Sequence, residues 1–329
     1  MNLEIIQAAP SPLLFSARPR IWWAGLAVIM PAVAIAVSPS PTSSAATDSE
    51  PEKFEWSDLL PTAWQENPRL HFTVTTELSE AGKKLPEVTP EHPAYFQLRV
   101  SGYREVGDTP AGEKTLKAEE IEPTLVRALA TSGYQPAKPD RAPSLLVTYR
   151  WGTHNLIDPD NPDRSQAVRN ILDRALLVGG EKFAGDLGAA YREAAVFAPI
   201  SKNLPPEVRE FTDPINLLKM RDSKTRFLVE RTTDDIYFIV AAAYDYKAFM
   251  EHRLVLLWRT RVTVTSQGVT QGQTLPTMIA TAGPFFGKET DGAEIIGRHT
   301  IPRGHVEIGT PTVVKPADAP AQAPAEKAK

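Results

Sequence analysis

The chain of 329 residues contains no cysteine. This absence excludes disulfide bonds, thiolate nucleophiles and thiolate zinc sites, and it also excludes a lipid attached to a cysteine near the N-terminus. The folded part of the protein must therefore draw its stability from the packing of its core.

An excess of charge of either sign is absent too. Lys and Arg together number 36 and Asp and Glu 40, which gives a formal net charge of −4. Because this balance lacks the basic footprint of proteins that bind nucleic acid, we expect no nucleic-acid partner. Hydrophobic residues make up 42% of the chain and charged residues 23%, which is typical of a globular protein.

Motifs for cofactors and catalysis are also missing. The segment Gly283-Pro-Phe-Phe-Gly287-Lys288 approaches a phosphate-binding loop, but it is one residue short and no Ser or Thr follows the lysine. None of the six histidines belongs to a His-Glu-x-x-His motif, and no Gly-x-Ser-x-Gly or Gly-x-Gly-x-x-Gly sequence occurs. We therefore predict no cofactor, no metal and no catalytic residue.

The N-terminal segment has the pattern of an export signal. Arg18 and Arg20 precede an uncharged apolar run at 21–37, and small residues follow at Ser44, Ala45 and Ala46. The run is also just long enough for a membrane helix, so an uncleaved signal anchor is the alternative. We interpret residues 1–46 as a signal peptide or signal anchor. The predicted location is periplasmic or secreted, with an anchor in the inner membrane if the segment is not cleaved.

Composition divides the rest of the chain. Residues 47–53 read as a flexible tether, and residues 315–329 are a Pro/Ala-rich stretch that we expect to be disordered. The intervening segment, 54–314, is the expected folded domain.

Periodicity predicts the elements of this domain. Alternating apolar and polar residues predict strands at 70–75, 96–101 and 144–151, and the pair 236–246 and 254–264, joined by a short link, predicts an antiparallel hairpin. In the second strand of the hairpin, Trp258 shares the apolar face and Arg259 points the other way. Helical spacing predicts helices at 118–132 and 275–286, an antiparallel helical pair at 165–180 and 183–194, and a helix that begins at Asp213-Pro214.

These elements favour an α+β fold. The predicted architecture is a mainly antiparallel sheet with helices on one face and a helical insertion at about 165–232.

The most polar segment near a strand end suggests a ligand site. Asp158 and Asp160 follow Trp151 and His154 within a few residues, which places oxygen and nitrogen ligands together. A calcium loop of the helix-loop-helix type is excluded because Pro162 occupies a ligand position. One interpretation is a turn in which the Asp side chains bond the local backbone, and the other is a weak cation or polar-ligand site.

Arg259 and Arg261 provide a second candidate. The two residues lie two positions apart in a predicted strand, so their side chains share one face and can recognise an anion. The alternative, which we favour from sequence, is the solvated face of a sheet balanced by acidic residues.

A family resemblance adds to this picture. A predicted helix ends in Leu129-Ala-Thr-Ser-Gly133-Tyr134, and a Pro-rich link leads to the strand Leu145-Leu-Val-Thr-Tyr149. This order resembles an uncharacterised family of bacterial cell-envelope proteins, many of them lipoproteins. The chain departs from the family in having no lipobox cysteine and in its long helical insertion. The resemblance implies an envelope location and brings no catalytic residues with it.

Together, these observations predict an exported, non-catalytic envelope protein that binds a partner, such as another envelope protein, or has a structural role. The alternative is a secreted or periplasmic hydrolase with a site near the loop from Trp151 to Asp163. The N-terminal segment, if uncleaved, implies contact with the membrane.

Overall fold

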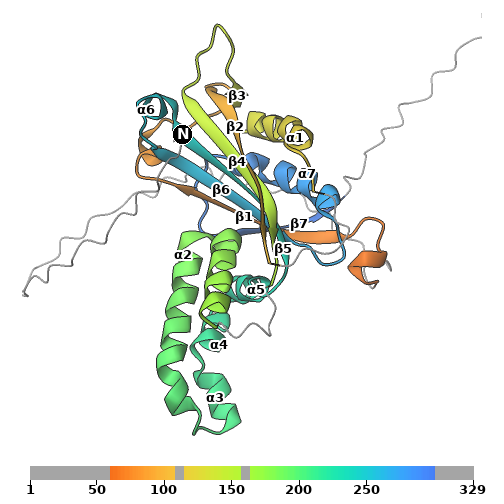
Figure 1. The fold of residues 1–329 in the computed structure, drawn as a ribbon, viewed down its shortest axis with the longest axis vertical. Coiled ribbons are helices and arrows are strands. Elements are labelled where there is room, and N and C mark those ends of the chain that lie inside the picture. Colours follow the sequence, from red (N-terminus) through yellow and green to blue (C-terminus); the bar gives the residue numbers. More distant parts are fainter. Residues whose placement is uncertain (1–59, 108–114, 157–163, 301–329) are drawn as a thin grey trace, which may run out of the picture. The chain divides into compact units, whose positions relative to one another are not determined.

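The computed structural model describes residues 60–107, 115–156 and 164–300. In this part of the chain seven strands form one sheet in the order β3-β2-β4-β5-β6-β1-β7 (Figure 1). The strands are β1 (Arg69–Leu78), β2 (Ala94–Val106), β3 (Tyr134–Pro136), β4 (Leu145–His154), β5 (Ile236–Asp245), β6 (Leu256–Thr265) and β7 (Glu294–His299).

The α+β class predicted from sequence is confirmed, but the sheet is mixed. Strand β2 runs parallel to both β3 and β4, whereas the pairs β4–β5, β5–β6, β6–β1 and β1–β7 are antiparallel. The reason lies in the connection between β2 and β4, which contains helix α1 (Ala118–Thr131). A crossover of this length returns the chain in the same direction, as parallel pairing requires.

The predicted hairpin of β5 and β6 is confirmed. The two strands pair antiparallel from Ile236 opposite Thr265 to Tyr244 opposite Leu256, and the short helix α6 (Tyr246–Met250) lies in the link between them. Asp245 caps α6 by accepting a hydrogen bond from the Ala248 amide at 2.6 Å. The β5 strand is buried along most of its length, because both of its faces are covered.

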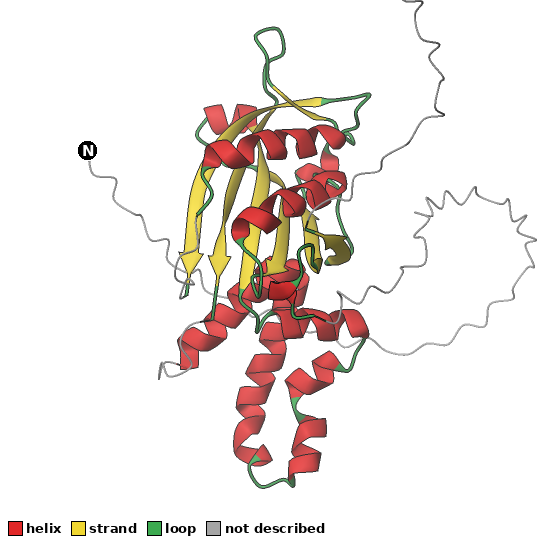
Figure 2. Cartoon of the chain, turned by 90° about the vertical axis from the view of Figure 1, so that its right-hand side faces the viewer, coloured by secondary structure: helices red, strands yellow, loops and turns green. Residues whose placement is uncertain are grey.

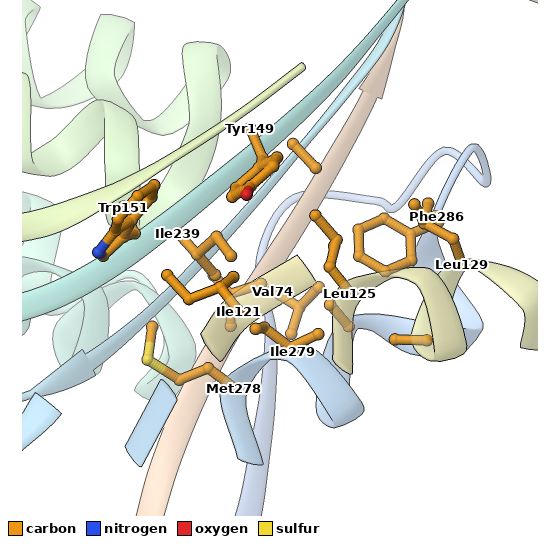
Figure 3. Close-up of a cluster of buried hydrophobic side chains, with 14 of the residues drawn as sticks. Val74, Ile121, Leu125, Leu129, Tyr149, Trp151, Ile239, Met278, Ile279 and Phe286 are labelled. Atoms are coloured by element: carbon orange, nitrogen blue, oxygen red, sulfur yellow. The ribbon is translucent and has the colours of Figure 1, made fainter. Parts of the chain in front are cut away.

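Helices α1 and α7 (Gln271–Ala282) cover one face of the sheet (Figure 2). Apolar side chains from both helices interlock with alternate residues of the strands in one core (Figure 3). Leu125 of α1 and Met278 of α7 have no exposed surface, and Trp258 is 4% exposed, so the predicted burial of this tryptophan is confirmed. Gly133 follows α1 with φ of 88°, as predicted for a helix-ending glycine.

The other face of the sheet also carries helices, which corrects the prediction that they lie on one face only. Helices α2 (Arg164–Ser201), α3 (Pro206–Thr212), α4 (Pro214–Lys219) and α5 (Ser223–Arg231) follow β4 in the chain. A second core joins α2, α4 and α5 to Ile236, Phe238 and Val240 of β5. The apolar run of β5 is nearly continuous because its alternate residues enter two different cores.

Helix α2 consists of two halves that turn back on each other at Gly180, where φ is 80°. The halves run antiparallel (Figure 1), and a side chain at Gly188 in the second half would meet Leu172 of the first. This confirms the predicted helical pair. Asp213 caps α4 as predicted, accepting hydrogen bonds from the amides of Ile215 and Asn216.

Single 3₁₀ turns occur at Thr62–Trp64 (η2), Gly82–Lys84 (η3) and Gly283–Phe285 (η4). No helix in the described ranges combines the length and the apolar character that a membrane span needs. The apolar run at 21–37 lies outside the described residues.

Candidate functional site

A cavity of about 120 Å³ lies between the sheet and the first half of α2. The strands contribute its basic residues together with Val106 and Phe238, and the helix contributes Asp173 and two leucines. The residues are Arg104, Val106, Arg150, His154, Asp173, Leu176, Leu177, Phe238, Arg259 and Arg261, and we call this space the arginine cavity.

The register of the strands explains how these side chains meet. Arg150 of β4 lies opposite Val240 of β5, which in turn lies opposite Arg261 of β6. Arg259 lies one row further along β6, and His154 lies four residues after Arg150 on the same face of β4. Because side chains alternate along a strand, all of these residues point toward α2.

Exposure falls from the mouth of the cavity to its floor. Arg104 and Arg150 are exposed and Arg259 is half-buried, whereas His154 is 3% and Arg261 2% exposed. The cavity therefore presents solvated guanidinium groups at its mouth and buried side chains below them.

Arg261 is held by an ion pair with Glu77 of β1. The other carboxylate oxygen of Glu77 accepts a hydrogen bond from the Glu181 amide at 2.5 Å, at the turn in the middle of α2. The Glu181 carboxylate lies 3.7 Å from Arg261 and 3.6 Å from Arg259. Because the Glu181 side chain is 68% exposed, its contribution to these pairs is small.

Arg104 and Arg150 form no ion pair within the described residues, in contrast to Arg259 and Arg261. The pKa of the Arg150 guanidinium is lowered, first by partial loss of solvent and then by the positive charges of Arg104, Arg259 and Arg261. Only the Tyr244 phenol acts on this pKa in the opposite direction. Among the described residues, the exposed Asp173 is the only carboxylate in the lining of the cavity, so the lining carries a net positive charge.

His154 lies at the inner end of the cavity. Burial lowers the pKa of its ring to about 4, and the charges of Arg174 and Arg104 add to this effect, which nearby backbone carbonyls oppose only in part. Neither ring nitrogen has a partner of normal hydrogen-bond geometry within the described residues. Arg174, which is 1% exposed, also leaves Nε and Nη1 without such a partner. The buried His154 ring and the Arg174 guanidinium near it thus both retain hydrogen-bonding capacity that the described residues do not use.

The structure separates the residues that the sequence groups together. Trp151 lies on the opposite face of the sheet, stacked on Tyr149 with ring centroids 5.7 Å apart, and belongs to the core of α1 and α7. Asp158 and Asp160 lie outside the described residues. His154, Arg259 and Arg261 line the arginine cavity.

The interpretation of Arg259 and Arg261 as a solvated pair is wrong for Arg261. The turn of α2 covers this end of the face, and a carboxylate on β1 neutralises the guanidinium beneath it. Sequence reasoning also missed Arg104 and Arg150. A signal for Arg150 exists, because it lies an even number of positions from His154 in one strand and so shares its face.

The described residues contain no group of three or more His, Asp or Glu side chains placed to hold a metal ion. In comparisons with known proteins, the chain matches no protein-family model and no curated sequence. The resemblance to envelope proteins therefore stays a prediction.

Proposed function

We infer that the protein is an exported, non-catalytic envelope protein whose α+β domain binds an anionic group in the arginine cavity. The observation that carries this inference is the convergence of Arg104, Arg150, Arg259, Arg261 and His154 on one small space, with Arg104 and Arg150 in no ion pair in the described chain. Guanidinium groups arranged in this way favour oxyanions, because each can donate two parallel hydrogen bonds.

The size of the cavity limits which ligands can bind in it. A volume of about 120 Å³ accommodates a phosphate, sulfate or carboxylate group but not a whole nucleotide or sugar. The ligand is thus a small oxyanion or the anionic group of a larger envelope component whose remainder stays outside. The exposed arginines at the mouth are suited to guide such a group inward.

Binding is favoured over hydrolysis by the state of His154. A histidine that acts as a general base is normally oriented by a hydrogen bond from its second nitrogen to an acceptor. The His154 ring has no such bond within the described residues, and the lowered pKa keeps it neutral and a poor proton acceptor at neutral pH.

Calorimetric titration of the protein with inorganic phosphate and sulfate tests this proposal. Arg150→Gln should weaken binding about tenfold or more, since hydrogen bonds to charged groups contribute about 1.5–3 kcal/mol. Arg127→Gln is the matched control, because Arg127 is an exposed arginine of α1 on the other side of the sheet. Equal binding by all three proteins contradicts the proposal.

A parallel assay with p-nitrophenyl phosphate addresses the hydrolase alternative. The proposed binding protein gives no turnover, whereas turnover that is lost in His154→Gln favours the hydrolase.

The export proposal rests on the N-terminal sequence alone and needs its own test. Residues 1–52 fused to a reporter that is active only outside the cytoplasm should give signal, and replacing Leu26 and Ile29 with Asp should abolish it, because charge in the apolar segment prevents insertion. An inactive reporter with the native segment contradicts this part of the proposal.

A further inference from the structure

A second and larger cavity, of about 550 Å³, lies near the other end of β4. It contains Leu145, the first residue of that strand, whereas the arginine cavity contains His154, the last. At about 3.3 Å per residue the two ends lie about 30 Å apart. The lining residues are Leu78, Gly82, Lys83, Leu85, Pro86, Glu87, Val88, Ala94, Tyr134, Ser144, Leu145, Asp245, Leu257, Trp258, Gly287, Lys288 and Glu289, and we call this space the tryptophan pocket.

The walls of the tryptophan pocket are mostly apolar. Leu78, Val88 and Leu257 form parts of it, and the segment between β1 and β2 contributes Leu85, which is 48% exposed. A volume in the range of about 300–1,000 Å³ with apolar walls is typical of sites for small organic molecules.

Two hydrogen-bond donors meet in this pocket. Trp258 is only 4% exposed, yet its Nε1 has no partner of normal hydrogen-bond geometry in the described residues. The Tyr134 hydroxyl lies next to it, with the two rings 5.5 Å apart. Burial raises the pKa of Tyr134 to about 12, and a hydrogen-bonding interaction with the Trp258 N–H, outside normal hydrogen-bond geometry, opposes this only in part, so the phenol stays protonated and able to donate.

Gly287 packs directly against both donors. Its φ of 69° favours glycine, and a Cβ at this position would lie 1.8 Å from the Tyr134 hydroxyl oxygen and 3.3 Å from Trp258 Nε1. Any larger residue would therefore occupy the space in front of the two donors. Gly287, Tyr134 and Trp258 all line the pocket, and the Nε1 atom itself is buried in its wall.

The charges at the rim do not favour an ion. Lys83 pairs with Glu289 at 2.9 Å, and the Asp245 carboxylate caps α6. The remaining charged residues of the lining are Lys288 and Glu87, both exposed and of opposite sign. With two lysines against three carboxylates, the rim carries a net charge of −1 and is thus close to neutral, unlike the arginine cavity.

We propose that the tryptophan pocket binds a neutral amphiphile, a molecule with an apolar body and an oxygen acceptor that receives hydrogen bonds from Trp258 Nε1 and the Tyr134 hydroxyl. Alcohols, esters and amides with a medium-length aliphatic or aromatic body belong to this class. The apolar walls bind the body, and the two donors fix its polar end.

Titration of the full chain with 1-decanol, and separately with decanoate, tests the proposal by calorimetry. Decanol should bind saturably and decanoate at least fivefold more weakly, because the neutral rim offers a carboxylate no compensation for lost hydration. Trp258→Phe, which keeps an aromatic ring but lacks the N–H, should weaken decanol binding about fivefold to tenfold. Leu85→Gln, at a half-exposed wall position, should weaken it by a similar factor without affecting the fold.

Two controls separate the pocket from the rest of the chain. Leu217→Gln alters an equally exposed leucine of α4, and Arg150→Gln alters the arginine cavity; both should bind decanol like the unmodified protein. The proposal is overturned if decanol shows no saturable binding, if decanoate binds as tightly as decanol, or if Leu217→Gln weakens binding as much as Leu85→Gln.

Discussion

The two faces of the sheet are built from the same strands but differ in composition. Toward α1 and α7 the strands contribute Phe72, Val74, Tyr149 and Val262, none more than 1% exposed, to a continuous apolar core. Toward α2 the same strands contribute basic residues and a smaller apolar cluster. Apolar burial supplies most of the stability of a domain, whereas clustered like charges oppose folding unless they are compensated.

From this difference we infer that the face toward α1 and α7 supplies most of the stability and that the face toward α2 binds the ligand. The alternation of side chains along β4 and β6 lets one residue belong to the core and the next to the arginine cavity. Trp258 and Arg259 are the sharpest case, because adjacent residues of one strand face the two sides. The following predictions test whether the faces are as different in energy as in composition.

The largest effect is expected on the core face. Trp258→Ala removes a ring that packs against Tyr134 and Phe286, and such a loss costs about 3–5 kcal/mol of the free energy of unfolding. Arg259→Ala should cost no more than about 1 kcal/mol, because its partner Glu181 is largely exposed. Urea denaturation midpoints of the two variants compare the faces directly, and a larger loss in Arg259→Ala contradicts the comparison.

A pH-dependent effect is expected on the α2 face. His154 has a pKa of about 4 in the folded protein against an ordinary 6.5, so the unfolded chain takes up its proton first as the pH falls. The contribution of neutral His154 is therefore complete above pH 6.5 and is lost progressively between about 6.5 and 4. At about 1.4 kcal/mol per pKa unit, the loss is at most about 3.5 kcal/mol.

The charged groups near His154 shape this effect. Arg104 and Arg174 hold its pKa down, while Asp173 lies on the wall of the same cavity. His154→Gln removes the proton site, so the difference in unfolding free energy between the two proteins should change by up to about 3 kcal/mol from pH 7 to pH 4. Measuring this difference cancels the other titrating groups, and parallel pH profiles of both proteins show that His154 is not buried in its neutral form.

An intermediate effect on stability is expected at the turn of α2, where Glu77 contacts both Arg261 and the Glu181 amide. Glu77→Gln leaves the buried Arg261 with the exposed Glu181 as its only charged partner among the described residues, and removes the negative charge from the acceptor of the Glu181 amide. We expect a loss of about 1–3 kcal/mol, less than for a fully buried pair because the Glu77 side chain is 27% exposed. Thermal unfolding of Glu77→Gln beside Glu87→Gln, an exposed glutamate elsewhere, measures it. Equal melting temperatures show that the pair does not hold the turn.

Local patterns predict the elements well, since alternation and helical spacing reflect burial directly. The burial of Trp258 follows from the alternation of a few neighbouring residues. The cap at Asp213 and the helix end at Gly133 can be predicted from a few residues each, because the chemistry of turns and caps is local. The packing of α2 on the second face is a long-range contact, and the sequence of the α2 segment alone does not indicate which face of the sheet it packs against.

The candidate site could be predicted from the sequence only in part. Trp151 and His154 are three positions apart in one strand, so a strict use of alternation places them on opposite faces and removes Trp151 from the site. The grouping with Arg104 and Arg261 is different. These residues belong to β2 and β6, and only the strand order β2-β4-β5-β6 brings them to one cavity.

The smallest effect on stability is expected for Arg150→Gln, and it separates binding from folding most clearly. Arg150 is exposed, forms no ion pair in the described chain, and is repelled by three other arginines. Its removal should change the free energy of unfolding by no more than about 0.5 kcal/mol, with a slight gain where the repulsion is relieved. The gain should shrink as salt is added, because exposed charges are screened.

The same substitution should weaken phosphate binding about tenfold, so a residue of little importance for folding is then important for the ligand. Phosphate should in turn raise the melting temperature of the unmodified protein more than that of Arg150→Gln, because a ligand stabilises only the state that binds it. If Arg150→Gln instead loses several kcal/mol of stability, the guanidinium is part of the structural framework. The α2 face would then resemble the core face in its role, and the contrast between the two faces would fail.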